Sequence, residues 1–443
     1  MAIAVLAAAC GDTKPDLERL YAVASTRSDR TPVIFVPGVM GSRLTDDNRG
    51  KEIWPGGFFT FLTGRHFSEL SLPVGAERVT DNRDAVRPTA LFYKAAGKDF
   101  YNNIVETLTG PGDYRCDPAD DPGPYTDCYL FAWDWRRDLV EAATRLDELI
   151  EHIRRVRGEP DLKVDIVAHS AGSLVTRYFI RYGGRDVLDE ERPVVDQAGS
   201  SKVRRAILIA APNYGSVSGL QRAIMGSPVG PLAKLQPEVL ATMPSLYELL
   251  PHPDRDWMID NEGKRIERDL YAVETWQDWH WSIFDPKVRE RIAERFADRE
   301  EAERYLVRLE TFMARALERG ERFHRSLSIP VAESQTEFIV FGGSCVLTSS
   351  HCALEKIDGK VMIRLNPDEL QTRMPGVDYA RLMLEPGDGT VTKSSLMARG
   401  TLDPDIPAAG YFPLDYVVFI CKGHAELPGD ITFRDNLLNI LLY

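Results

Sequence analysis

The segment at residues 164–178 holds the residues best placed for nucleophilic chemistry in this 443-residue sequence. It reads V-D-I-V-A-H-S-A-G-S-L-V-T-R-Y, a short apolar run followed by apolar positions at helical spacing. A serine at a sharp turn between a strand and a helix exposes its hydroxyl, and the first amides of the helix can stabilise an oxyanion. Ser170 is therefore the candidate nucleophile, and the amide of Ala171 is a candidate oxyanion-hole donor.

This turn reads A-x-S-x-G, with Ala168 where a glycine is usual. A small residue is needed there because the strand and the helix approach closely behind the serine, and one methyl group is the smallest departure. Taken alone, the segment could also be an ordinary buried strand that runs into a helix and carries an incidental serine.

A hydroxyl nucleophile needs a base, and the base needs an orienting acid. His424, in C-K-G-H-A-E-L, follows an apolar strand and is the candidate base. Asp388, in E-P-G-D-G-T-V, lies between two glycines, in a turn that can direct a carboxylate without steric hindrance. The chain order of Ser170, Asp388 and His424 is nucleophile, acid, base, which is the order of the α/β-hydrolase fold.

Other titratable residues near the predicted strands are weaker candidates. His169 is adjacent to the serine, and neighbouring residues on a tight turn point in different directions. Asp134 lies beside two arginines, which favours a structural ion pair, and Asp165 lies within a strand and not after its end.

A second oxyanion-hole donor is expected in the glycine-bearing loop of P-V-I-F-V-P-G-V-M-G-S-R-L. The loop directly follows a buried strand, so its amides come close to the carboxyl edge of the sheet. Val39 and Met40 carry the nearest amides, and the sequence does not choose between them. The alternative is a glycine turn that serves only to reverse the chain.

The elements that position these residues alternate between strands and helices. Apolar runs predict strands at residues 32–36, 129–133, 163–168, 205–211, 336–341 and 417–420, and helical patterns cover residues 139–157 and 433–442. This alternation predicts an α/β-hydrolase fold, with a mostly parallel sheet, helices on both faces and an inserted helical cap. Such sheets bind ligands at the carboxyl ends of the strands, where the candidate residues lie.

Four regions follow from the same patterns. Residues 1–30 form an N-terminal leader or tether, 31–215 the first part of the hydrolase core, 216–330 the helical cap and 331–443 the second part of the core. An aromatic stretch at residues 51–72 contains Phe58, Phe59 and Phe61 and is read as a lipid-facing flap, or alternatively as aromatic filling of the core. The charged tract at residues 286–325 belongs to the cap, or is an exposed structural helix.

The net negative charge of the chain disfavours anionic partners. The formal net charge is -13, with 44% hydrophobic and 27% charged residues. Nucleic acid and anionic membranes are therefore not expected to attract this chain by charge, and any contact with lipid has to use apolar side chains. Oligomeric state is not readable from the sequence.

The N-terminus reads M-A-I-A-V-L-A-A-A-C-G-D, an apolar run too short to span a bilayer. It resembles the end of a bacterial lipoprotein signal, with Cys10 as the lipidated residue. An exported or membrane-anchored protein is therefore expected, with a cytoplasmic protein that has a frayed N-terminus as the alternative.

The remaining cysteines suggest local bridges. Cys116 and Cys128 bracket one short loop, and Cys345 and Cys352 bracket another, so each pair could close a disulfide and leave Cys421 over. Six reduced cysteines are the alternative.

An acidic loop next to Cys116 carries Asp117, Asp120 and Asp121, which could hold calcium. A solvated turn is the better interpretation because no spaced ligand motif is present. No metal and no cofactor are expected.

Seven motifs in one order resemble the lecithin:cholesterol acyltransferase family, which also includes phospholipid:diacylglycerol acyltransferases and lysosomal phospholipase A2. They are P-V-I-F-V-P-G-V-M-G-S-R-L, F-A-W-D-W-R-R, A-H-S-A-G, A-A-P-N-Y-G-S, M-P-S-L-Y-E-L-L-P, G-D-G-T-V with a following S-S-L, and G-H-A-E-L. The resemblance is to a bacterial-type member and runs from about residue 31 to the C-terminus, with no family motif at residues 255–330. Ala168, Met40 and the lack of a cysteine at residues 51–72, where the family has a lid disulfide, are departures.

The resemblance implies a serine acyl-enzyme mechanism on lipid esters at a membrane or lipid-particle surface. The donor would be of the phospholipid type, and water or a lipid alcohol would accept the acyl group. One alternative is a lipase or esterase on neutral or soluble esters. The other is a catalytically silent α/β-hydrolase that acts as a binding protein.

Overall fold

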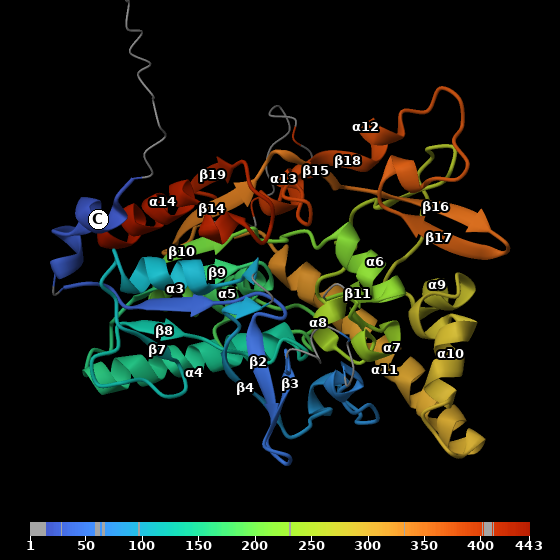
Figure 1. Cartoon of the computed structure of the whole chain (residues 1–443), viewed down its shortest axis with the longest axis horizontal. Coiled ribbons are helices and arrows are strands. Elements are labelled where there is room, and N and C mark those ends of the chain that lie inside the picture. The colour runs from blue at the N-terminus through green and yellow to red at the C-terminus, as the bar shows by residue number, and fades with distance from the viewer. Residues whose placement is uncertain are drawn as a thin grey trace, which may run out of the picture.

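A parallel seven-stranded sheet forms the centre of the molecule (Figure 1). The computed structural model describes residues 15–27, 29–57, 63, 67–95, 98–229, 232–331, 333–400, 402, 410 and 412–443. The strand order is β19-β14-β10-β9-β1-β8-β7. The bounds are β1 (Val33–Val36), β7 (Cys116–Pro118), β8 (Cys128–Leu130), β9 (Val164–His169), β10 (Val203–Ile209), β14 (Glu337–Gly343) and β19 (Tyr416–Ile420).

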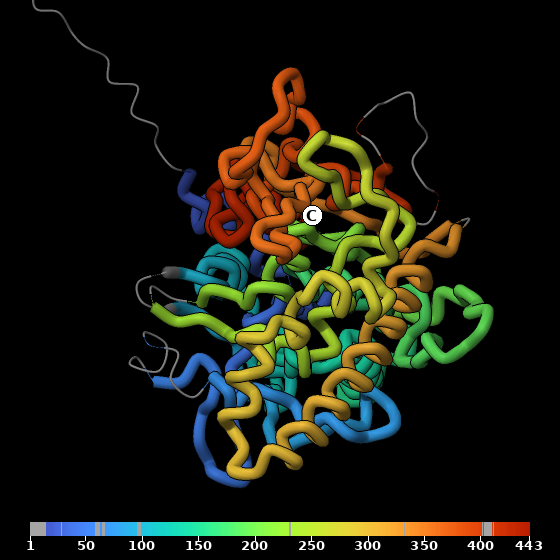
Figure 2. Tube along the Cα trace, turned by 90° about the vertical axis from the view of Figure 1, so that its right-hand side faces the viewer, coloured from blue at the N-terminus to red at the C-terminus, as the bar shows by residue number. Residues whose placement is uncertain are grey.

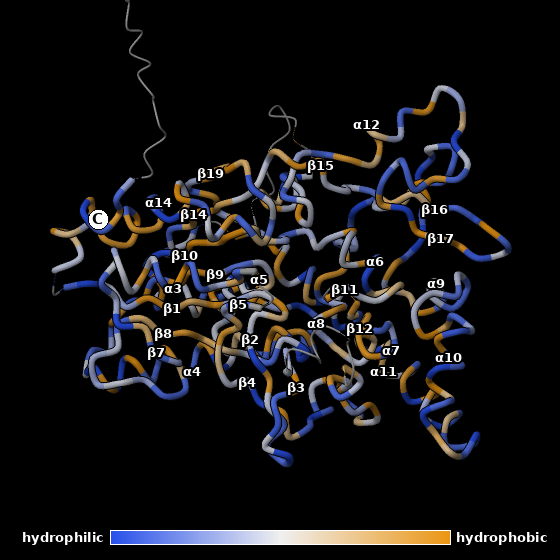
Figure 3. The backbone as a smooth tube through the Cα atoms, viewed as in Figure 1, coloured by the Kyte–Doolittle hydropathy of each residue, from blue (hydrophilic) through white to orange (hydrophobic). Residues whose placement is uncertain are grey.

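Helices cover both faces of this sheet. Because side chains alternate along a strand, Ile34 and Val36 pack in one apolar core with α4 (Leu139–Arg157) and α5 (Ala171–Tyr182). Val33 and Phe35 pack in a second core with α1 (Leu17–Tyr21), α3 (Asn102–Thr109) and α14 (Ile431–Leu442). Figure 3 shows the resulting apolar centre around β1, β9 and β10. The structure therefore has the α/β-hydrolase fold expected from the sequence.

Between β10 and β14 the chain forms mainly helices. Three strands of two residues each also occur there, although the sequence pattern indicated none. A strand of two residues is too short to show alternating hydrophobicity. The bounds are α6 (Val217–Met225), β11 (Ser227–Pro228), β12 (Lys234–Leu235), α7 (Pro237–Leu240), α8 (Pro244–Tyr247), β13 (Met258–Ile259), α9 (Val273–Asp278), α10 (Pro286–Ala293) and α11 (Arg299–Leu327). Figure 2 looks onto the end of the molecule formed by α9, α10 and α11.

Smaller sheets surround the core. Their bounds are β2 (Ser42–Asp46), β3 (Lys51–Trp54) and β4 (Val86–Leu91); β5 (Lys94–Ala95) and β6 (Lys98–Asp99); β15 (Val346–Ser349) and β18 (Leu384–Gly387); and β16 (Cys352–Ile357) and β17 (Lys360–Arg364), which join β13. The short helices α12 (Tyr379–Met383) and α13 (Lys393–Leu396) flank β18.

Ile53, Trp54, Phe67 and Leu70 of the expected flap pack into the core, whereas Lys51 is exposed. Trp54 is 1% exposed, and its ring centroid lies 5.2 Å from that of Trp135. Phe58, Phe59 and Phe61 lie outside the described residues, as does Cys10.

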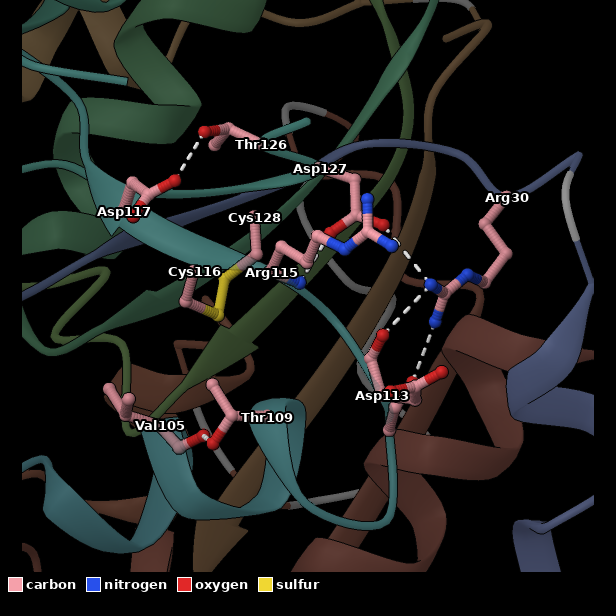
Figure 4. Close-up of a disulfide and its surroundings, with 11 residues drawn as sticks. Arg30, Val105, Thr109, Asp113, Arg115, Cys116, Asp117, Thr126, Asp127 and Cys128 are labelled. Atoms are coloured by element: carbon pink, nitrogen blue, oxygen red, sulfur yellow. Dashed lines mark hydrogen bonds and ion pairs between the residues drawn. A yellow bond between two sulfur atoms is a disulfide. The ribbon is translucent and has the colours of Figure 1, made fainter. Parts of the chain in front are cut away.

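Cys116 and Cys128 form a disulfide between the neighbouring strands β7 and β8, as Figure 4 shows. Next to it, Asp127 accepts hydrogen bonds from the side chain of Arg30 and the amide of Arg115. The bridge and these bonds fasten the edge of the sheet.

The predicted pairing of Cys345 with Cys352 is wrong, because Cys345 bonds to Cys421. The strands β14 and β19 are neighbours, and Gly343 is in register with Ile420. Cys345 and Cys421 therefore leave the sheet side by side, with their Cα atoms 5.1 Å apart. Cys352 instead begins β16, where it is buried as a free thiol.

Among the residues that the structure describes, no helix has an apolar stretch of the length needed to span a membrane. No group of three or more His, Cys, Asp or Glu side chains among them is arranged to hold a metal ion. In the acidic loop, Asp117 accepts from the Thr126 hydroxyl and Asp120 pairs with Arg145.

Candidate active site

Ser170 lies at a sharp turn between β9 and α5, with a backbone φ of 53° and ψ of -124°. A Cβ atom added at Gly172 would lie 2.5 Å from the carbonyl oxygen of Val36. One added at Gly38 would lie 2.8 Å from Cβ of Ser170. Both glycines are therefore needed for the close approach of backbone around the serine. Ala168 lies fully buried within β9, where its methyl group is accommodated.

The serine, His424 and Asp388 form one hydrogen-bonded chain. His424 Nε2 lies 3.0 Å from Ser170 Oγ, and His424 Nδ1 lies 2.8 Å from Asp388 Oδ2. Ser170 and His424 follow β9 and β19 of the parallel sheet, at the carboxyl edge expected for such a sheet. Asp388 follows β18, which pairs with β15 outside that sheet, and lies next to Gly343 in β14.

The Asp388 carboxylate is held by its own turn. It is 4% exposed, and its Oδ1 accepts hydrogen bonds from the amides of Thr390 at 2.9 Å and Val391 at 2.7 Å. Burial favours the neutral acid, but His424 and these amides together hold the pKa of Asp388 below its usual range. An ionised carboxylate only accepts, so His424 Nδ1 donates to it and Nε2 is left to accept the proton of the serine.

The two residues that carry the candidate amides of the oxyanion loop, Val39 and Met40, line the same cavity as Ser170. The loop is fastened at both ends, because Trp133 Nε1 donates to Pro37 O at 2.9 Å and Trp54 Nε1 donates to Met40 O at 3.0 Å. Met40 has a positive φ of 64°. Both Val39 and Met40 remain candidates for the second donor.

Tyr101 is a site residue that no sequence motif marked. Its hydroxyl lies 2.9 Å from the amide of Gly38 and 2.9 Å from Nδ1 of His169. Burial, with a smaller contribution from His424, lowers the pKa of His169 to about 3, so this imidazole is neutral. Its Nε2 lies 3.2 Å from the carbonyl oxygen of His424.

The weaker candidate acids have structural partners. Asp134 forms a buried ion pair with Arg136 at 2.7 Å, and Asp165 pairs with Arg204. Of the two arginines beside Asp134, the second, Arg137, pairs with Glu141 instead.

A cavity of about 380 Å³ opens at Ser170. Its wall is mainly apolar and includes Trp54, Phe92, Trp135, Leu240, Met243 and Leu246. Ser218, Gly219 and Arg222, which share one face of α6, add a polar strip to this wall.

The parallel sheet and the serine turn define the class of protein as an α/β-hydrolase. The sequence model of the family "Lecithin:cholesterol acyltransferase" matches residues 126–279. The resemblance to this family is thereby confirmed over that segment, which contains Ser170 but ends before Asp388 and His424.

Several solved structures match this chain at low sequence identity. A chain of the Tle4-Tli4 complex is 14% identical, with 94% of this chain and 98% of that chain covered and a TM-score of 0.54. Staphylococcus hyicus lipase is 10% identical, with 97% and 96% covered and a TM-score of 0.35. Mature Bacillus licheniformis lipase BlEst2 is 11% identical, with 94% and 93% covered and a TM-score of 0.33.

A comparison with the curated proteins finds no match. Together, the family match and the fold support hydrolysis or acyl transfer on lipid esters as the class of activity.

Proposed function

We propose that this chain is a serine-dependent lipid acyl hydrolase or O-acyltransferase, with Ser170 as nucleophile, His424 as base and Asp388 as the orienting acid. One observation carries the proposal: the hydrogen-bonded chain from Asp388 through His424 to Ser170 ends in a mainly apolar cavity.

In the proposed reaction, Ser170 Oγ attacks the carbonyl carbon of an acyl ester while His424 Nε2 takes the hydroxyl proton. The carboxylate of Asp388 stabilises the imidazolium that forms. The amide of Ala171 and that of Val39 or Met40 hold the oxyanion. The intermediate collapses to an acyl-enzyme, and the leaving alcohol takes the proton from His424. Water or a lipid alcohol then attacks the acyl group, with His424 again as base.

Incubation with a phospholipid vesicle that contains a sterol or a diacylglycerol tests this function and separates transfer from hydrolysis. Labelled acyl groups should appear as sterol ester or triacylglycerol in the first case and as free fatty acid in the second. Ser170→Ala should abolish both products. Equal product from this variant contradicts the proposal, and a folded protein that releases no acyl group supports the alternative of a silent binding protein.

The polar strip of α6 favours a phospholipid-type acyl donor. Arg222 lines the cavity wall, where burial lowers the pKa of its guanidinium, and among the described residues no acidic side chain pairs with it. A guanidinium without a partner is well suited to bind a phosphate group. The apolar remainder of the wall would accept acyl chains, and it suits neutral esters equally well.

Arg222→Ala distinguishes the two donors. We expect kcat/KM on phosphatidylcholine vesicles to fall about tenfold relative to kcat/KM on a neutral p-nitrophenyl ester, the size of one charge-assisted hydrogen bond. Gln221→Ala, on the same helix but away from the cavity, is the matched control. An unchanged ratio in Arg222→Ala favours the neutral lipase or esterase.

We further propose that residues 216–330 act as a cap over the site, with residues 51–72 as a flap, and that the protein works at a lipid surface. Three short elements of the cap contribute to the cavity wall, namely α6, α7 and α8. Next to them, Leu232 is 77% exposed and Met225 is 41% exposed, and each could contact lipid.

We propose that the protein is exported, because it contains two disulfides and such bonds are typical of oxidising compartments. Mass spectrometry of the native protein tests the lipoprotein form. An unmodified N-terminus that retains Met1 would rule out lipidation of Cys10.

A further inference from the structure

A buried chain of hydrogen bonds runs from the oxyanion loop to the loop of the candidate base. The amide of Gly38 lies 2.9 Å from Tyr101 Oη, which lies 2.9 Å from His169 Nδ1. His169 Nε2 then lies 3.2 Å from the carbonyl oxygen of His424. Tyr101 is 5% exposed and His169 is 6% exposed, so water has little access to these bonds.

Only one arrangement of protons satisfies every group. The Gly38 N–H donates to Tyr101 Oη, and a carbonyl oxygen can only accept, so His169 Nε2 carries a proton and donates to His424 O. His169 Nδ1 is then unprotonated and accepts the single hydroxyl proton of Tyr101. The arrangement requires a neutral imidazole, in agreement with the low pKa that burial gives His169.

The chain connects three parts of the site that are distant in sequence. Gly38 directly precedes the candidate oxyanion donors, and His169 directly precedes Ser170. His424 takes part through its carbonyl oxygen, which accepts the hydrogen bond from His169 Nε2. The amide of His424 also donates to Asp388 O at 2.9 Å. A displacement of the oxyanion loop therefore has to break a buried hydrogen bond and leave its donor or acceptor without a partner.

We propose that Tyr101 and His169 are positioning residues that hold the oxyanion loop and the His424 loop at the spacing required for acyl transfer. This inference rests on the proposed function, because it assigns these residues a role in the Ser170 reaction. Neither side chain reacts; each acts through the backbone that it holds.

The central test is Tyr101→Phe, which removes both hydrogen bonds of the hydroxyl and keeps the ring. Rates are expressed per site titrated with a fluorophosphonate, so that misfolded protein is not counted. We expect kcat to fall at least about tenfold with KM within about twofold, since a small displacement of the reacting groups is costly. Affinity for a lipid trifluoromethyl ketone, which forms a tetrahedral oxyanion with the serine, should fall by the same factor.

Tyr114→Phe is the matched control. Tyr114 is also a buried tyrosine of the same apolar core, and its hydroxyl has no hydrogen-bond partner among the described residues. If Tyr101→Phe and Tyr114→Phe have equal kcat per site and equal affinity for the ketone, the inference is overturned while the proposed function stands. If the wild type takes up no fluorophosphonate at Ser170, both fail.

A measurement on the wild-type protein covers the case in which Tyr101→Phe does not fold. Nitrogen NMR of histidine-labelled protein, with His169→Asn to assign the signal, should show His169 as a neutral Nε2–H tautomer that does not titrate between pH 5 and 8. A Nδ1–H tautomer, or titration in this range, would overturn the inference.

Discussion

Ser170 keeps a backbone conformation that serine rarely adopts, because the structure around it fixes the turn between β9 and α5. Such a conformation costs about 1–3 kcal/mol for a residue with a side chain. The turn thus trades stability for an exposed hydroxyl within reach of His424.

This strain predicts an unusual order of stability between two inactive variants. Ser170→Gly should be more stable than Ser170→Ala by about 1 kcal/mol, because glycine adopts positive φ without steric cost. Urea unfolding measures the difference. A glycine variant that is less stable than the alanine variant would show that the turn is not strained.

The two small residues of the A-x-S-x-G turn should respond differently to substitution. Gly172→Ala brings a methyl group to 2.5 Å from the carbonyl oxygen of Val36, so we expect a loss of about 3 kcal/mol or more in unfolding free energy. Ala168→Gly only removes a buried methyl group and should cost about 1 kcal/mol. Equal losses in urea unfolding would contradict this explanation of the motif.

At this scale the sequence indicated Ser170 and His424 because each lies in a short motif after an apolar run, and Asp388 because it lies between two glycines in a turn. Tyr101 and Arg222 have no such motif. Their positions in the site come from the folding of distant loops onto the sheet edge, and a single sequence does not contain that information.

At the scale of elements, the long apolar strands and the amphipathic helices were predictable. The helix expected at residues 139–157 has those bounds in α4, and the strand expected at residues 336–341 corresponds to β14. The edge strand β7 was not predicted, because C-D-P has no apolar pattern. The order of strands in the sheet was also not predictable, and this is why the bridge between Cys345 and Cys421 was missed.

This bridge predicts a link between disulfide chemistry and activity. Cys421 is three residues from His424, so replacing Cys345 and Cys421 by serine should lower both the unfolding free energy, by about 4 kcal/mol for so long a loop, and kcat per folded molecule. Serine at Cys116 and Cys128, in a bridge across β7 and β8, should cost about 3 kcal/mol and leave kcat unchanged. Urea unfolding and active-site titration separate the two effects. Equal kcat in both variants would show that the Cys345–Cys421 bridge does not support the His424 loop.

At the scale of the whole molecule, three buried histidines make the fold sensitive to acid. Burial lowers the pKa of His169 to about 3 and of His252 to about 4, and it lowers the pKa of His324 well below its usual value. In the unfolded chain these residues bind protons below about pH 6.5, whereas in the folded chain they stay neutral. Above pH 6.5 these histidines are neutral in both states, so protonation of the unfolded chain does not lower the stability of the fold.

As the pH falls from 6.5 toward the folded pKa, each of these histidines should remove about 1.4 kcal/mol of stability per pH unit. We expect His252→Gln to reduce the difference in unfolding free energy between pH 7.5 and pH 5, measured by urea unfolding. The reduction should equal the contribution of one histidine between pH 6.5 and pH 5. His152→Gln, at an exposed position of α4, is the control and should leave that difference unchanged. The same difference in both variants would mean that His252 is not buried as a neutral group.

The proposed function requires Ser170 to be the reactive nucleophile at the end of the Asp388 and His424 chain. Labelling of the folded protein with a fluorophosphonate, followed by peptide mass spectrometry, tests this most directly. We expect one adduct per chain, on Ser170, absent from Ser170→Ala and strongly slowed in His424→Ala. A folded wild-type protein without an adduct, or an adduct on another residue that persists in Ser170→Ala, would contradict it.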